Sequence, residues 1–141
     1  MKKTLQALNG LAQDGVIGRY AIGGAMGATF YVEPFSTFDL DVFVVLPESG
    51  GLVTLAPLYA ALSKRGYPAQ DECVRVEGIP VRFLPAGTSL LQEALAQARE
   101  VSYDDVPTRV FGPEHLVAVA VQAGRPKDRQ RVQMFLDAGG L

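Results

Sequence analysis

The chain has 141 residues, of which 48% are hydrophobic and 20% charged, and its formal net charge is −2. These values argue for one folded domain and against disorder, and they lack the strong positive charge of many nucleic-acid-binding proteins. A single cysteine, Cys73, excludes an intrachain disulfide. We see no signal-peptide pattern and no apolar run long enough to span a membrane, and we therefore expect a cytoplasmic protein without a membrane partner. The candidates for a local basic patch are Lys64-Arg65, Arg125, Lys127, Arg129 and Arg131.

Hydrophobic spacing predicts an α/β chain in which helices and strands are mixed. Leucines at helical spacing predict a helix over 3–13, and an apolar run predicts a strand over 20–22 that leads into Gly23-Gly24. The further predicted elements, in chain order, are a helix over 25–31, a turn over 33–37, a strand over 38–46, a helix over 52–65, a hairpin of 73–77 with 79–84, a helix over 90–99, an extended piece over 107–111, and helices over 113–122 and 127–136. No repeat or linker interrupts them, so we expect one domain over 1–141.

Two carboxylates lie on the clearest predicted strand. Asp39 and Asp41 are separated by one residue, so both point to one face, whereas Leu40 and Val42 point to the apolar face. Two close carboxylates repel each other unless a cation lies between them, and oxygen ligands of this kind suit Mg²⁺ together with substrate phosphates. The alternative is a strand end whose two aspartates face water.

A glycine pair precedes these carboxylates. Gly23-Gly24 lies between a predicted strand and a predicted helix. Glycines at such a turn let the backbone approach a ligand closely, and the amides of the following helix can bind phosphate. The alternative is a tight strand-to-helix turn without a ligand.

The order of these motifs resembles a known signature. Ile22-Gly23-Gly24, fourteen residues, and then Asp39-Leu40-Asp41-Val42, with Thr37 two residues before Asp39, resembles the DNA polymerase β-like nucleotidyltransferase superfamily. The spacing looks like that of the AbiEii-type toxin nucleotidyltransferases. A second block, 114–118 followed by Ala123-Gly124-Arg125-Pro126-Lys127-Asp128, looks like the helix and Lys-Asp pair of that family.

The resemblance implies the nucleotidyltransferase fold, a mixed sheet flanked by helices with a C-terminal helical segment. It implies that Asp39 and Asp41 are catalytic and bind Mg²⁺. It also implies that Gly23, Gly24, Thr37, Lys127 and Asp128 contact the nucleotide. For Lys127 and Asp128 the alternative is a solvated helix start, in which Asp128 favours the helix dipole.

The chain departs from the family at the third acidic position. The matching strand is 79–84, and if Val81 and Phe83 face the core, Arg82 takes the place of the acid. An arginine cannot bind metal, but it can pair with Asp39 or Asp41. The residues that could supply the third acid from a displaced position are Glu77, Asp71 and Glu72. Two cationic positions of the family are also changed, to Phe35 and Ala120.

Two further residues, His115 and Cys73, are expected to have structural roles and no part in catalysis or metal binding. His115 is the single histidine and has no cysteine partner nearby, so we expect a surface or capping role. Cys73 lies on an apolar strand and is expected to be a buried small hydrophobe.

Two functions of different classes follow from these patterns. The first is Mg²⁺-dependent transfer of a nucleoside monophosphate from a nucleoside triphosphate to a hydroxyl of an RNA, a protein or a small molecule. The second is a catalytically inactive binding or regulatory module of the same fold, for instance in a toxin–antitoxin complex. The replacement of the third acid by Arg82 is the feature that distinguishes the two functions. If another acid reaches Asp39 and Asp41 from elsewhere in the chain, the enzyme is favoured. The oligomeric state is left open.

Overall fold

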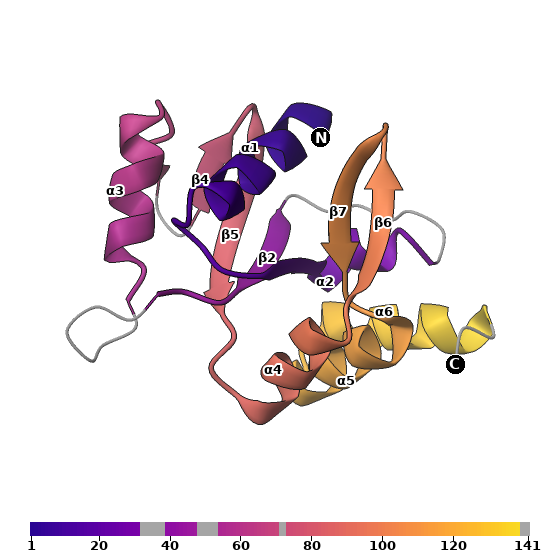
Figure 1. Cartoon of the computed structure of the whole chain (residues 1–141). Helices are drawn as coiled ribbons and strands as arrows, with labels where there is room; N and C mark the ends of the chain where they lie inside the picture. Colours follow the sequence, from indigo (N-terminus) through magenta and orange to yellow (C-terminus); the bar gives the residue numbers. More distant parts are fainter. Residues whose placement is uncertain (32–38, 48–53, 71–72, 139–141) are drawn as a thin grey trace.

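The computed structural model describes residues 1–31, 39–47, 54–70 and 73–138 (Figure 1). The helices are α1 (Lys2–Gln13), α2 (Gly24–Ala28), α3 (Ala56–Lys64), α4 (Ser89–Ala96), α5 (Pro113–Ala123) and α6 (Pro126–Asp137). The strands are β1 (Tyr20–Gly23), β2 (Leu40–Val44), β3 (Ala69–Gln70), β4 (Cys73–Val76), β5 (Ile79–Pro85), β6 (Arg99–Tyr103) and β7 (Val106–Val110). The strands form one mixed sheet in the order β3-β4-β5-β2-β1-β7-β6. The α/β fold class predicted from the sequence is therefore confirmed.

Strand β2 lies at the centre of the sheet and separates two cores. It pairs with β1 antiparallel and with β5 parallel. Its residues Leu40, Val42 and Val44 are fully buried in one core, as the period of two predicts. Phe43 belongs to the other core. The alternation therefore places Asp41 on the same side of the sheet as Phe43.

Helices cover both faces of the sheet. Leucines of α1 and α3 fill the first core, among them Leu8 and Leu62. The second core joins α4, α5 and α6, which contribute Leu95, Leu116 and Phe135. In Figure 1, α4, α5 and α6 gather at the lower side of the molecule and α1 lies at the upper side. Asp41 therefore faces the layer of C-terminal helices.

Most predicted elements lie where the sequence places them, but two strands were missed, the short edge strand β3 and the edge strand β6. The helix predicted over 90–99 ends at Ala96, and Arg99 already begins β6. β6 and β7 form a hairpin whose turn residues, Asp104 and Asp105, both have positive φ, of 51° and 67°. Aspartate tolerates this conformation better than most residues, so the Asp-Asp pair was the available signal for a turn at this place.

Some expected features lie outside the described residues. They are the turn over 33–37, Phe38 at the start of the predicted strand, and the glycines at 139 and 140. Within the described parts of the chain, no helix is long and apolar enough to cross a membrane.

Candidate functional site

The glycine pair is required by the close packing of β2 side chains. Gly23 ends β1, and Gly24 begins α2 with φ +60°. A Cβ atom on Gly24 would lie 2.4 Å from Oδ2 of Asp41, and one on Gly23 would lie 2.5 Å from the ring of Phe43. The two glycines thus leave space for Asp41 and Phe43. Their contact with a phosphate stays a prediction.

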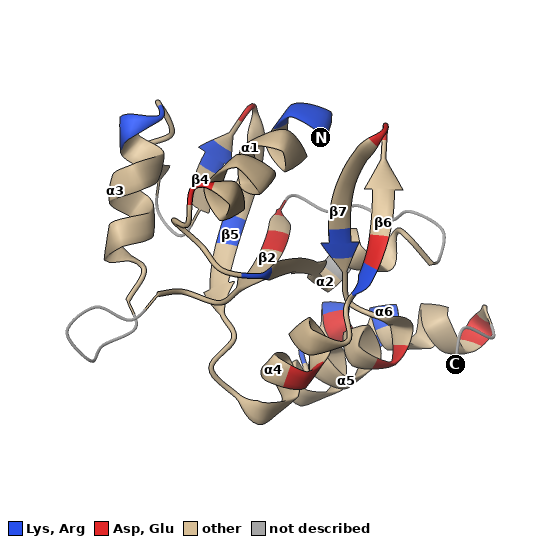
Figure 2. Ribbon diagram, viewed as in Figure 1, with Lys and Arg blue, Asp and Glu red and all other residues tan. Residues whose placement is uncertain are grey.

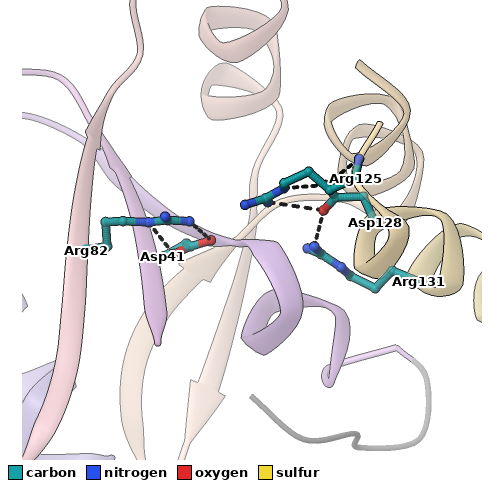
Figure 3. A network of polar contacts seen from close by, with 5 residues as sticks. All are labelled: Asp41, Arg82, Arg125, Asp128 and Arg131. Atoms are coloured by element: carbon teal, nitrogen blue, oxygen red, sulfur yellow. Dashed lines mark hydrogen bonds and ion pairs between the residues drawn. The ribbon is translucent and has the colours of Figure 1, made fainter. Parts of the chain in front are cut away.

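Asp41 is held by Arg82 of the neighbouring strand. The parallel register of β2 and β5 places Arg82 directly beside Asp41. Nε of Arg82 donates to Oδ1 at 3.2 Å, and Nη2 donates to Oδ2 at 3.3 Å (Figure 3). Figure 2 shows the acidic and basic positions side by side on these two strands. The arginine predicted to pair with an aspartate does so with Asp41.

Charge around Arg82 keeps this side chain protonated. Burial by itself lowers the pKa of Arg82, but the hydrogen bond to Asp41 and the negative charges of Asp41 and Asp39 raise it above its usual value. The side chains of Arg82 and Asp41 are only 25% and 14% exposed, so solvent screens this pair incompletely. Arg82 therefore carries its positive charge beside Asp41 at the centre of the sheet.

Among the residues that the structure describes, the predicted acids do not form a cluster of three or more carboxylates. Asp39 lies one residue before β2 and acts electrostatically on Arg82. Glu77 lies at the tip of the β4–β5 hairpin, where it accepts a hydrogen bond from the hydroxyl of Tyr67 at 2.7 Å. Three further candidates lie outside the described residues: Thr37, Asp71 and Glu72.

A second ionic cluster lies at the start of α6. Gly124 ends α5 in a left-handed conformation, and Pro126 begins α6, so Arg125 is the N-cap residue. Asp128 accepts hydrogen bonds from the backbone amide of Arg125 at 3.2 Å and from its Nε at 2.6 Å. Nη2 of Arg125 and Nη2 of Arg131 both donate to Oδ1 of Asp128. One carboxylate therefore orients two arginines.

Asp128 is a buried residue, which corrects its interpretation as part of a solvated helix start. Its side chain is 1% exposed, and that of Arg131 is 8% exposed. Burial alone would raise the pKa of Asp128, but the hydrogen bonds from Arg125 and the positive charges of Arg131 and Arg125 lower it below its usual value. Lys127 is exposed and does not line the pocket described next.

The two ionic clusters face each other across one pocket of about 190 Å³. We call it the arginine pocket. Its ionisable lining residues and the glycine at its rim are Gly24, Asp41, Arg82, Arg125, Asp128 and Arg131. Figure 3 shows Arg125 extending from α6 toward the Asp41–Arg82 pair. The apolar wall includes Leu116 and Ala120.

Sequence reasoning missed the importance of Arg125 and Arg131, which it named only as candidates for a basic patch. The available signal was their spacing, because residues three positions before and three positions after Asp128 share one side of a helix with it. The pocket thus draws on one predicted acid of β2 and on an arginine–aspartate cluster that the sequence did not predict.

The pocket residues do not fit a pair of magnesium ions. Both oxygens of Asp41 are engaged by Arg82, which stands where the sequence resemblance led us to expect a third acid. Among the described residues, no group of three or more aspartate, glutamate, histidine and cysteine side chains is placed to hold a metal ion. The arrangement can instead attract an anion, since three arginines and two aspartates line the pocket.

The depressed pKa of Asp128 predicts a pH-dependent difference in stability. A carboxyl group whose pKa is lower in the folded than in the unfolded chain stabilises the fold fully above its unfolded pKa, about 3.9, and loses this contribution as pH falls further. We expect urea unfolding to give a large difference in free energy between the wild type and Asp128→Asn near pH 7. The difference should narrow below about pH 4. A difference that stays constant from pH 7 to pH 3 would contradict the assignment.

The remaining two predicted residues lie away from the pocket lining. Nε2 of His115 lies 3.2 Å from Oε2 of Glu93, and the His115 side chain is only 14% exposed, so the surface role expected of it is not confirmed. Cys73 begins β4 and is half-buried, so the expectation of a buried residue was wrong. The side chains of a strand near the edge of the sheet are covered less completely by neighbouring elements than those of a central strand.

Comparison with solved structures identifies the fold. An antigenic nucleotidyltransferase-like protein from Paracoccidioides brasiliensis superimposes with a TM-score of 0.65 at 13% identity, over 97% of this chain and 74% of that chain. ANT(2'')-Ia in complex with adenylyl-2''-tobramycin superimposes with a TM-score of 0.58 at 15% identity, over 96% of this chain and 89% of that chain. The solution structure of this antibiotic-resistance factor gives a TM-score of 0.54 at 15% identity, over 98% and 84% of the two chains.

These likenesses extend over almost the whole chain at low sequence identity. No protein-family model matches the sequence, and no curated protein matches it. The chain therefore has the nucleotidyltransferase fold, as the glycine and aspartate motifs predicted, and its function has to be argued from its own residues.

Proposed function

We propose that this nucleotidyltransferase-fold chain is a nucleotide-binding module that does not carry out magnesium-dependent nucleotidyl transfer. The observation that carries the proposal is the pair of hydrogen bonds from Arg82 to both oxygens of Asp41. Arginine stays protonated under all ordinary conditions and has no lone pair for a metal. It neutralises Asp41 without offering the open coordination positions that metal-assisted phosphoryl transfer requires. As a regulatory module, the chain would act together with a partner protein such as an antitoxin.

The arginine pocket supplies what binding without transfer needs. Its three arginines offer donors suited to phosphate oxygens. Gly24 also lines the pocket, and because it has no side chain, the Asp41 carboxylate has room beside the turn. The pocket thus favours an anionic ligand of the nucleotide class.

We expect Arg82→Asp to create a magnesium site that the wild type lacks. The substitution removes the cation beside Asp41 and adds a third oxygen ligand from β5, so Mg²⁺ affinity should rise at least about tenfold, or about 1.4 kcal/mol. Isothermal titration calorimetry with MgCl₂ measures it. The matched control is Arg75→Asp, the same change of charge at an exposed position of the neighbouring strand β4, which should leave Mg²⁺ binding as in the wild type.

A transfer assay tests the proposal from the other side. Wild-type protein is incubated with a radiolabelled nucleoside triphosphate and Mg²⁺. The acceptors offered are the protein itself, RNA and small hydroxyl compounds. We expect no incorporation of label above the level without protein. Transfer at enzyme-like rates by the wild type, together with unchanged Mg²⁺ binding in Arg82→Asp, would overturn the proposal.

The second candidate is transfer to a small-molecule hydroxyl, and one observation favours it. ANT(2'')-Ia, which shares the fold, is seen in complex with adenylyl-2''-tobramycin. For this chain to act in the same way, Asp39 and Asp41 would have to hold Mg²⁺ after Arg82 has moved away. Incorporation of label into a small hydroxyl compound, but not into RNA or protein, would support this candidate over the binding module.

A further inference from the structure

Arginines from two distant parts of the chain meet in the arginine pocket. Arg82 comes from β5, whereas Arg125 and Arg131 come from the first turns of α6. We propose that this pocket binds the phosphates of its ligand directly and without a divalent cation, with arginine side chains in the place of metal ions. The inference rests on the proposed nucleotide-binding function and adds the way in which the phosphates are held.

Two of the arginines are fixed in advance. Asp128 is almost completely buried and accepts hydrogen bonds from both Arg125 and Arg131. The bond from Nε of Arg125 is short, at 2.6 Å, as expected of a charge-assisted contact. A ligand that meets arginines already held in place loses less conformational entropy on binding. Asp128 is therefore a positioning residue, not a ligand of the nucleotide.

Arg125 keeps donor groups that its contacts with Asp128 do not use, and it extends toward the Asp41–Arg82 pair (Figure 3). Arg125 uses Nε and Nη2 for Asp128, and its side chain is 45% exposed. Within the described parts of the chain, its Nη1 has no hydrogen-bond partner. A guanidinium group carries five N–H donors, so the contacts with Asp128 leave donors for phosphate oxygens.

Arg82 is the arginine that can change partner. Its hydrogen bonds to Asp41 measure 3.2 and 3.3 Å, longer than the roughly 2.7–2.9 Å of strong charge-assisted bonds. Arg82 lies close enough to Arg125 for each to feel the charge of the other. A phosphate between them would be attracted by both, and would relieve their mutual repulsion.

The charge balance of the α6 cluster also points to an anion. One carboxylate, Asp128, serves two arginines, and the positive end of the helix dipole lies at the same place. Asp41 acts on both Arg125 and Arg131 from across the pocket, but its oxygens are hydrogen-bonded to Arg82. A phosphate group in the pocket would supply the missing negative charge.

Calorimetry with inorganic triphosphate and with ATP in the presence of EDTA tests the inference. We expect the wild type to bind both without a divalent cation, and we expect Mg²⁺ to leave the affinity unchanged or to weaken it. Arg125→Gln and Arg82→Gln should each weaken binding about tenfold, because each removes a charge-assisted contact. The matched control is Arg129→Gln, the same substitution at an exposed position of α6, which should bind like the wild type.

The possible results separate this inference from the proposed function. Binding of ATP with Mg²⁺ but not with EDTA would overturn the inference and leave nucleotide binding intact. No binding of ATP under either condition would overturn both. If Arg125→Gln and Arg129→Gln weaken the binding of ATP equally, the effect comes from the overall charge, and the arginine pocket is not the binding site. Thermal unfolding shows whether each variant is folded. If Arg125→Gln does not fold, Arg82→Gln on strand β5 provides a second test of the same pocket.

Discussion

We expect Asp128→Asn to lower the free energy of unfolding by about 3–5 kcal/mol near neutral pH, as measured by urea unfolding. The substitution keeps the shape of the side chain but removes the charge that balances Arg131, whose side chain is 8% exposed. Breaking a buried ion pair by removal of one partner leaves the other charge uncompensated, and this accounts for the size of the effect. The same change weakens the start of α6, because Asp128 also accepts a hydrogen bond from the backbone amide of Arg125.

The matched control is Asp137→Asn on the same helix. Asp137 is exposed and accepts a hydrogen bond from Gln133, so its replacement should change the free energy of unfolding by less than about 0.5 kcal/mol. Equal losses in the two variants would mean that Asp128 acts only through the net charge of α6, and the cluster would then not be a buried structural element.

We expect Gly23→Ala to destabilise the fold by about 2–3 kcal/mol for steric reasons alone. The backbone of Gly23 is extended, with φ −125°, so alanine meets no conformational penalty there. Its Cβ atom, however, would lie 2.5 Å from the ring of Phe43 and 3.0 Å from that of Phe111. The two rings pack with their centroids 4.8 Å apart in a buried core, so neither can move away freely.

Two further variants check this explanation by thermal or urea unfolding. Gly10→Ala in α1 meets no atom within 4 Å and should stabilise the protein by roughly 0.5–1 kcal/mol, as alanine does in a helix. Phe43→Leu combined with Gly23→Ala should cost less than the sum of the two single substitutions, since the smaller side chain makes room for the methyl group. Full additivity would contradict a clash between residues 23 and 43.

The centre of the sheet could be predicted from the sequence because its pattern is local. The alternation of side chains along 40–44 and 79–84 placed Asp41 on the face opposite Leu40 and Val42, and placed Arg82 opposite Val81. Two strands with this alternation bring Asp41 and Arg82 together once they pair in register. The contact therefore followed from periodicity and from the strand order of the fold.

The α6 cluster could not be predicted in the same way. Charged residues at a helix start are usually solvated, and nothing local indicates that Asp128 is buried. Edge strand β6 was missed for a related reason. Its side chains are largely exposed, so it has no apolar face whose period could indicate a strand.

The salt bridge between β5 and β2 has a consequence for how the folded state depends on its surroundings. Proteins that gather carboxylates around a cation are stabilised by mass action when that cation is present, and their folded fraction follows its concentration. In this chain Arg82, a covalently attached cation, lies next to Asp41. The central strands thus have their own counter-ion, and we expect the amount of folded protein to be independent of the magnesium supply.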